Sequence, residues 1–127
     1  MNVHHPQSTA VTIANTASLS NAIDLTKTDG QTVVGIVIPA AWTAAGIAFK
    51  VSVDGATYVP LYDGRTPSAP VEYGFASGDV PTAEARAFAL DPSVFAGFNY
   101  LKIVSGTNAA PVNQGAARTL YVQSRRV

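Results

Sequence analysis

Residues 47 to 62 read IAFKVSVDGATYVPLY, and this stretch decides the fold class. Large apolar side chains occupy every second position from 47 to 53, with alanine, lysine and serine between them. Successive side chains of a β-strand point to opposite faces, so the alternation predicts a strand that is buried on one face and solvated on the other. Asp54-Gly55 follows as a turn, because glycine reaches the positive φ that tight hairpins need. Residues 58 to 62 are the predicted return strand of a hairpin.

Other segments carry the same kind of signal. Pro60 cannot donate a ladder hydrogen bond, which places the return strand at a sheet edge or at a bulge. Residues 33 to 38 are apolar on both faces, so we predict a central strand there. The remaining predicted strands are residues 10–13, 20–25, 86–90, 100–104 and 119–123. The in-phase side chains expected in the core are Phe49, Val51, Ile36, Leu101, Ile103 and Leu120.

Helical signals are weak. Residues 91 to 97 predict a short connector with Asp91 as N-cap, Pro92 at the first helical position and Gly97 as terminator. Residues 39 to 45 could form a single turn. Residues 63 to 85 form a long excursion rich in proline and glycine, and residues 108 to 117 form a second loop. Long loops on a rigid β scaffold often carry function, so the excursion becomes the expected contact surface if the N-terminal residues do not anchor the protein to its partner.

Short strands, Gly/Pro/Asp turns and little helix are typical of an all-β sandwich or barrel. A chain of 127 residues fits one domain. We predict a single jelly-roll-like β-sandwich over residues 10 to 127, with an immunoglobulin-like Greek-key sandwich as the alternative. Residues 1 to 9 are a predicted flexible N-terminal arm, because they have no apolar period. In an assembly this arm is expected to lie along a neighbouring subunit, the alternative being a plain disordered tail.

The composition indicates a surface that neighbours cover. Charged residues make up 13 % of the chain and the net charge is zero, whereas soluble domains usually carry about 25 %. Because surface charge opposes self-association, we predict a homodimer or homotrimer. The chain has no cysteine, which excludes disulfides, thiolate zinc sites and cysteine nucleophiles.

Two partner classes are not expected. The basic residues are scattered, with only Arg125 and Arg126 adjacent, whereas nucleic-acid binding needs a basic stripe. The longest apolar stretch, residues 33 to 42, contains glycine and proline and is too short to span a bilayer. No signal peptide is visible. The protein is therefore predicted to be soluble, to be made in the host cytoplasm, and to bind neither nucleic acid nor membrane.

No residue pattern indicates catalysis or metal binding. His4 and His5 precede the first predicted strand, and a zinc site or a triad needs ligands held by a scaffold. Most carboxylates fit structural uses at turns and caps, namely Asp29, Asp54, Asp79 and Asp91. The others, which have no such position, are Asp24, Asp63, Glu72 and Glu84. Their spacing marks no acid–base pair, phosphate loop or calcium loop. We therefore predict a protein that is not an enzyme and has no catalytic residue, cofactor or metal site.

Aromatic residues leave two interpretations open. Trp42, Tyr58, Tyr62 and Tyr73 could line a sugar-stacking platform, as in lectin-like sandwiches. Alternatively, Trp42 packs against the edge of the sandwich, and the tyrosines bury their rings while their hydroxyls stay in water. The second interpretation is favoured, because no spacing groups these rings on one strand face.

Four stretches together carry a family resemblance. They are residues 34–45 (VGIVIPAAWTAA), 49–63 (FKVSVDGATYVPLYD), 89–107 (ALDPSVFAGFNYLKIVSGT) and 118–122 (RTLYV). The chain from about residue 18 onward resembles the small virion proteins of tailed bacteriophages that are encoded near capsid genes. The resemblance implies a jelly-roll-like subunit arranged in symmetric clusters on the capsid surface of the virion.

The resemblance also implies a function. It predicts a capsid decoration or cement protein that binds across neighbouring major capsid protein subunits and stabilises the shell. The alternative is a carbohydrate- or receptor-binding module of a phage fibre. Specific binding on a glycan array would favour the second function.

Overall fold

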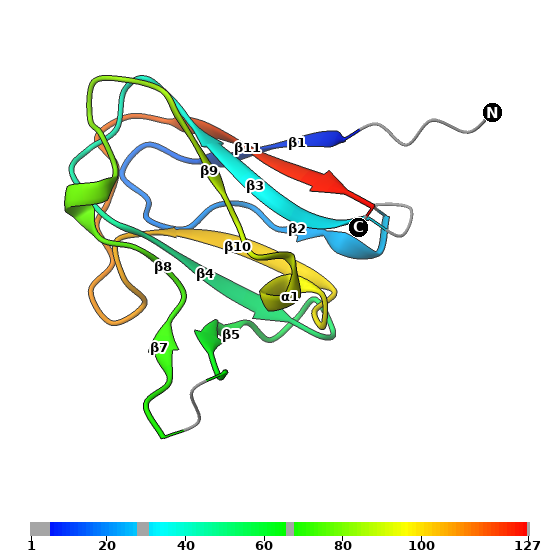
Figure 1. The fold of residues 1–127 in the computed structure, drawn as a ribbon. Helices are drawn as coiled ribbons and strands as arrows, with labels where there is room; N and C mark the ends of the chain where they lie inside the picture. The colour runs from blue at the N-terminus through cyan, green and yellow to red at the C-terminus, as the bar shows by residue number, and fades with distance from the viewer. Residues whose placement is uncertain (1–5, 28–30, 66–67, 127) are drawn as a thin grey trace.

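The computed structural model describes residues 6–27, 31–65 and 68–126, and it is an all-β sandwich (Figure 1). One sheet has the strand order β1 (Gln7–Ile13), β11 (Arg118–Arg125), β3 (Thr32–Ile38) and β9 (Arg86–Ala89). The facing sheet has the order β2 (Ile23–Asp24), β10 (Tyr100–Ser105), β4 (Ile47–Ser52) and β5 (Val59–Pro60). All of these strand pairs are antiparallel. The predicted sandwich is confirmed.

The core lies between the two sheets and is built from the alternation seen in the sequence. The six side chains expected in the core are each at most 1 % exposed, namely Phe49, Val51, Ile36, Leu101, Ile103 and Leu120. β3 lies between β11 and β9, which confirms that residues 33 to 38 form an interior strand. Pro60 lies in β5 at the end of its sheet, which confirms the predicted edge position.

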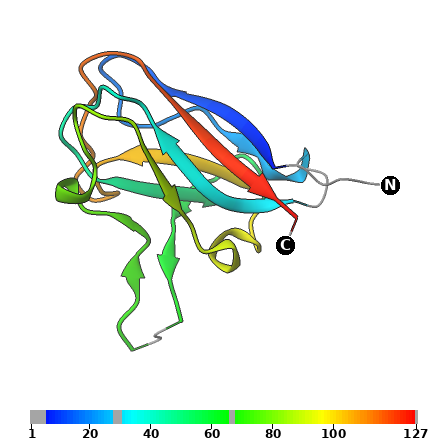
Figure 2. The same ribbon diagram turned by 45° about the horizontal axis from the view of Figure 1, so that its top comes forward.

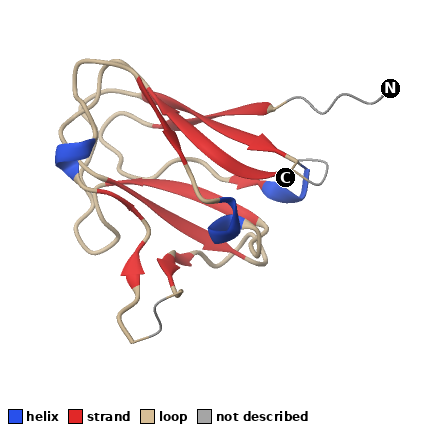
Figure 3. Cartoon of the chain, viewed as in Figure 1, coloured by secondary structure: helices blue, strands red, loops and turns tan. Residues whose placement is uncertain are grey.

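The helical segments are short (Figure 3). α1 (Pro92–Phe95) begins as predicted, because the Asp91 side chain accepts a hydrogen bond from the backbone N–H of Ser93. The described residues also contain two 3-10 turns, η1 (Leu25–Lys27) and η2 (Ser77–Asp79). Residues 39 to 45, all of them described, form no helical turn, and the indole Nε1 of Trp42 donates to the carbonyl oxygen of Ala45 at 3.1 Å.

The predicted solvated face of β4 needs a correction. Ala48 and Ser52 are buried, although their alternation assigns them to solvent, and Val53 is 67 % exposed although it was predicted to be buried. Ala48 is small and lies between Val104 on β10 and a strand on its other side. The Ser52 hydroxyl is enclosed by the following turn, where it accepts the backbone N–H of Gly55 at 2.9 Å. The strand ends at Ser52, so Val53 no longer faces the core.

The first strand also differs from the prediction. β1 begins at Gln7, whereas the sandwich was predicted to begin at residue 10. β11 extends to Arg125 and offers partners as far as Ser124, so Gln7 pairs with Ser124 and Ser8 with Gln123. The Gln123 amide also donates to the Ser8 hydroxyl at 2.9 Å. Residues 7 to 9 are therefore part of the sheet, while the rest of the predicted arm lies outside the described residues except for Pro6.

The excursion over residues 63 to 85 has a structure of its own. β6 (Tyr62–Asp63) pairs with β7 (Val71–Glu72), and β8 (Gly74–Phe75) then returns to pair with β4. The ring of Phe75 stacks on that of Phe88 with the ring centroids 4.3 Å apart. This stacking fixes the middle of the excursion against β9.

Candidate functional site

A short two-stranded ribbon, formed by β6 and β7, projects from the edge of the sandwich beside β4 (Figures 1 and 2). The chain enters the ribbon at Leu61, which follows β5 and whose backbone N–H donates to the carbonyl oxygen of Phe49 on β4 at 3.0 Å. The ribbon ends at Tyr73, whose backbone N–H donates to the carbonyl oxygen of Leu61 at 3.0 Å. Both ends of the ribbon are thus held by the sheet, and only its outer part extends into solvent.

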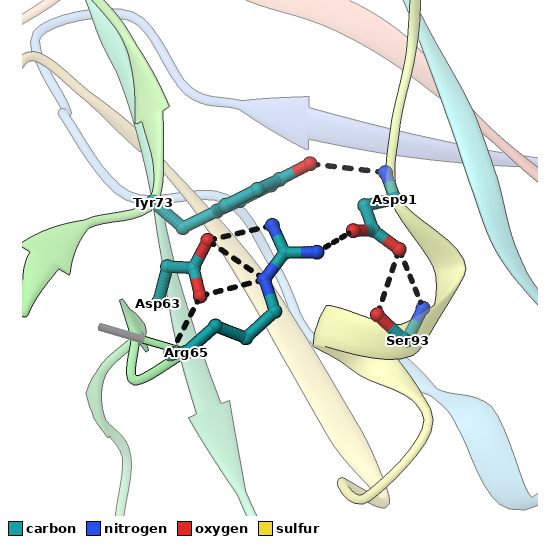
Figure 4. A network of polar contacts seen from close by, with 5 residues as sticks. All are labelled: Asp63, Arg65, Tyr73, Asp91 and Ser93. Carbon is teal, nitrogen blue, oxygen red and sulfur yellow. Dashed lines mark hydrogen bonds and ion pairs between the residues drawn. The ribbon is translucent and has the colours of Figure 1, made fainter. Parts of the chain in front are cut away.

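A polar network holds the ribbon against α1 (Figure 4). The Asp63 carboxylate accepts hydrogen bonds from the guanidinium of Arg65, at 2.7 Å from Nη2 and 3.0 Å from Nε. The Nη1 atom of Arg65 forms an ion pair with Asp91, which is also the N-cap of α1. The planar guanidinium suits this bridging role, since it presents donors toward two carboxylates at once. We call these three residues the clamp.

Tyr73 joins the clamp to the core. Its hydroxyl accepts the backbone N–H of Asp91 at 3.0 Å. Its ring packs edge-on against Phe95 at a centroid distance of 5.5 Å and lies 5.9 Å from Phe49. Edge-to-face aromatic pairs add about 0.5–1.5 kcal/mol beyond the area that they bury. The base of the ribbon is therefore anchored both by polar contacts and by packing.

The clamp also shifts the pKa values of its members. Hydrogen bonds from the Arg65 side chain hold the pKa of Asp63 below its ordinary value of 3.8. The pKa of Asp91 is lowered mainly by the hydrogen bond from the Ser93 hydroxyl, with Arg65 as a further cause. Hydrogen bonds with Asp63 raise the pKa of Arg65 in turn. All three groups are therefore charged at neutral pH, and the clamp is at full strength there.

Each face of the ribbon exposes one large apolar side chain. Tyr62 is opposite Glu72, and Asp63 is opposite Val71, so Tyr62 and Val71 lie on opposite faces. Tyr62 is 52 % exposed and Val71 is 66 % exposed. Beside Tyr62, a hollow of about 410 Å³ separates the ribbon from α1. Its lining includes Leu61, Arg65, Val94 and Phe98.

The structure does not assemble the four aromatic residues into a sugar-stacking platform. Trp42 is only 3 % exposed and belongs to the core. Tyr73 packs in the aromatic cluster described above, and the ring of Tyr58 is covered by the ammonium of Lys102 at 4.5 Å from the ring centroid. Tyr62 is the one member of this set whose residue is exposed.

The carboxylates for which the sequence predicted no turn or cap position have structural partners. Glu72 accepts from the Asn108 side-chain amide at 2.9 Å, which ties the ribbon to the 108–117 loop. Glu84 pairs with Arg86 at 2.8 Å. Asp24 accepts from the backbone N–H of Thr26 at 2.9 Å. The ranges that the structure describes contain no group of three His, Asp or Glu residues able to hold a metal ion. His4, His5 and Asp29 lie outside the described residues.

Two residues that matter structurally were not singled out from the sequence. Arg65 was one of several scattered basic residues, and only its nearness to Asp63 in the chain hinted at a local ion pair. Its second partner, Asp91, is 26 residues away. Gln114 is 1 % exposed within the polar 108–117 loop, where its amide bonds Thr43 and Ser105. A long-range contact of this kind leaves no local pattern in the sequence.

Within the described ranges, no helix has the length and apolar character needed to cross a bilayer. Comparison of the chain with protein-family models, with curated proteins and with solved structures found no significant match.

Proposed function

We propose that the chain is a structural virion protein that decorates a bacteriophage capsid and stabilises it by binding across neighbouring major capsid protein subunits. The observation that carries the proposal is the ribbon, which exposes Tyr62 on one face and Val71 on the other. A ribbon with apolar side chains on both faces fits a crevice between two capsid subunits, because each face then contacts a different subunit. Tyrosine is also among the residues that most often dominate binding energy at interfaces.

The rigidity of the ribbon base supports the same proposal. Binding costs about 0.5–1.5 kcal/mol for each long side chain that must be ordered. The clamp already holds Arg65 between Asp63 and Asp91, and Tyr73 is packed into the core. The ribbon therefore loses little freedom on docking.

Stabilisation of the shell would follow from mass action. A ligand that binds only the assembled state stabilises it by RT ln(1 + [L]/Kd), which is about 2.7 kcal/mol per site at a hundredfold excess over Kd. Many copies on one shell multiply this effect. A chain with 13 % charged residues and no net charge suits such a setting, since neighbours cover much of its surface.

Co-sedimentation with capsids tests the proposal. Purified protein is mixed with capsids assembled from the major capsid protein of the phage that encodes it, and bound protein is quantified against concentration. Tyr62→Ala should weaken binding at least about tenfold, as expected of an interface hot spot, and Val71→Ala should weaken it by a smaller factor. Tyr121→Ala is the matched control, because Tyr121 is an exposed tyrosine on β11 and not on the ribbon. Equal binding by all three variants, or no binding by the wild type, would contradict the proposal.

A carbohydrate- or receptor-binding role in a phage fibre is the second candidate. The hollow beside Tyr62 favours it, because an exposed aromatic ring and the Asp63–Arg65 pair line the same cavity of about 410 Å³. Sugar-binding sites combine such a ring with polar groups of fixed orientation. Specific glycan binding on an array, lost in Tyr62→Ala and kept in Tyr121→Ala, would support this role in place of capsid decoration.

A further inference from the structure

The outer edge of β1 lacks the features that usually prevent a sheet edge from pairing. β1 is seven residues long, reads QSTAVTI and contains no charged residue, proline or glycine. It ends its sheet, with β11 as its only strand partner among the described residues. Long, uncharged edge strands are templates for pairing with another chain, and proteins normally block them with charge, proline, bulges or short length.

Among the residues that the structure describes, the other edge strands of the sandwich are short or blocked. β2 and β8 have only two residues each, and β5 contains Pro60 and continues into the ribbon. β9 is four residues long and begins at Arg86, whose guanidinium pairs with Glu84. Just beyond the end of β9, the backbone N–H of Asp91 donates a hydrogen bond to the Tyr73 hydroxyl. β1 is therefore the edge that remains available.

The backbone groups that β1 presents outward can be assigned from its contacts. Thr12 is hydrogen-bonded to Asn21 on the side away from β11. The backbone N–H of Thr12 donates to Oδ1 of Asn21 at 2.8 Å, and its carbonyl oxygen accepts the backbone N–H of Asn21 at 3.3 Å. In an antiparallel strand, alternate residues direct their backbone groups to the same side. Ser8 and Ala10 therefore face outward with Thr12, and neither has a hydrogen-bond partner on that side within the described part of the chain.

This free window has a defined length. At one end Asn21 occupies the backbone of Thr12, and at the other end Pro6 has no N–H to donate. The β1 strand of a second copy can pair antiparallel with this window about a two-fold axis at Thr9. In this register, every free outward backbone group of the window finds a partner. Ser8 of each copy then exchanges both backbone hydrogen bonds with Ala10 of the other. The two Thr9 residues lie directly opposite, a favourable cross-strand pair, and no like charges meet.

We infer that the chain forms a two-fold dimer in which β1 pairs with β1 of a second copy, so that the four-stranded sheets of both copies become one continuous sheet. This inference goes beyond the proposed function and gives the homodimer predicted from the low surface charge a defined interface. It is tested without capsids, so its failure is separate from a failure of capsid binding by the ribbon.

The experiment compares the full chain with two proline variants by sedimentation equilibrium. The wild type should have twice the chain mass of 13.2 kDa. Ala10→Pro removes an outward N–H and no hydrogen bond to β11, so this variant should be folded and monomeric at the concentration at which the wild type is dimeric. Ala87→Pro is the matched control. Its N–H also faces outward, since the neighbouring Phe88 faces β3, and it should remain dimeric.

Amide hydrogen exchange of the wild type gives a second measurement that needs no variant. The N–H groups of Ser8 and Ala10 should exchange slowly in the dimer and faster on dilution. Those of Thr9 and Val11, which face β11, should not change. A monomeric or trimeric wild type, a dimeric Ala10→Pro, dissociation of both proline variants, or fast and concentration-independent exchange at Ser8 and Ala10 would each overturn the inference. If Ala10→Pro fails to fold, the exchange measurement decides.

Discussion

Phe49 is the residue on which the core and the candidate site both depend. Its ring is fully buried and lies edge-on to Phe95 at 5.3 Å, next to Tyr73 at the base of the ribbon. Phe49→Ala leaves a cavity among these rings and should lower the free energy of unfolding by about 3–5 kcal/mol. Urea denaturation measures the loss. Val71→Ala, at an exposed position of the ribbon, should change it by less than about 0.5 kcal/mol. Equal midpoints for the two variants would contradict the assigned strand phase.

Gly74 is required because β8 passes very close to β4. A Cβ atom at this position would lie 2.1 Å from the carbonyl oxygen of Ile47, a backbone atom that cannot move aside cheaply. Gly74→Ala should therefore push β8 away from β4 and destabilise the protein by about 1–3 kcal/mol, as overpacking usually does. Thermal melting is the measurement. Gly78→Ala is the control, since no heavy atom lies within 4 Å of its added Cβ. A melting temperature of Gly74→Ala equal to that of the control would refute the close approach.

Among the elements, the ribbon should respond to pH through its clamp. The pKa values of Asp63 and Asp91 are lowered in the folded protein from 3.8, so their stabilising contribution is complete above that value and is lost as the pH falls through their folded pKa values. Both carboxylates are near the surface, so the effect on global stability is small. The expected result is backbone motion of larger amplitude at the Tyr62 and Val71 amides at low pH, measured by nitrogen-15 relaxation.

Arg65→Met provides the control for this effect. The variant keeps much of the side-chain length but has no charge, so the ribbon should already be mobile at neutral pH. The Asp91 cap of α1 should persist in it, because Ser93 supplies those hydrogen bonds. Relaxation rates of the ribbon that are the same in Arg65→Met and in the wild type at neutral pH would show that the clamp does not order it.

For the whole molecule, one cooperative unfolding transition is expected. β3 and β11 of one sheet and β4 and β10 of the other supply side chains to the same core, so neither sheet keeps its buried face without the other. Trp42 is the single tryptophan and is buried, which makes its fluorescence a probe of packing. The fluorescence and far-ultraviolet circular dichroism midpoints should coincide at a fixed protein concentration. Separate midpoints would indicate that the two sheets unfold independently.

The sequence by itself determined which large apolar side chains at the centre of the strands face the core, the main turns and the N-cap of α1. These features depend on local chemistry: alternation places Phe49 and Val51 in the core, and Pro60 cannot lie inside a ladder. Asp91 caps α1 because its short side chain reaches a backbone N–H only two residues away. Such features depend on residues a few positions apart, so they can be predicted without knowing which distant segments lie nearby.

Only the tertiary structure decided which polar and small residues are buried and where the ribbon is held. Gln114 is in the core because Thr43 and Ser105 satisfy its amide, and Ala48 is covered by flanking strands. Arg65 reaches Asp91 across 26 residues of chain. The physical reason is common to all three. Each depends on contacts between segments that are distant in the sequence. Hydrogen-bond partners make the burial of the Gln114 amide tolerable, neighbouring strands cover Ala48, and Asp91 pairs with Arg65. Contacts of this kind leave no local pattern in the sequence.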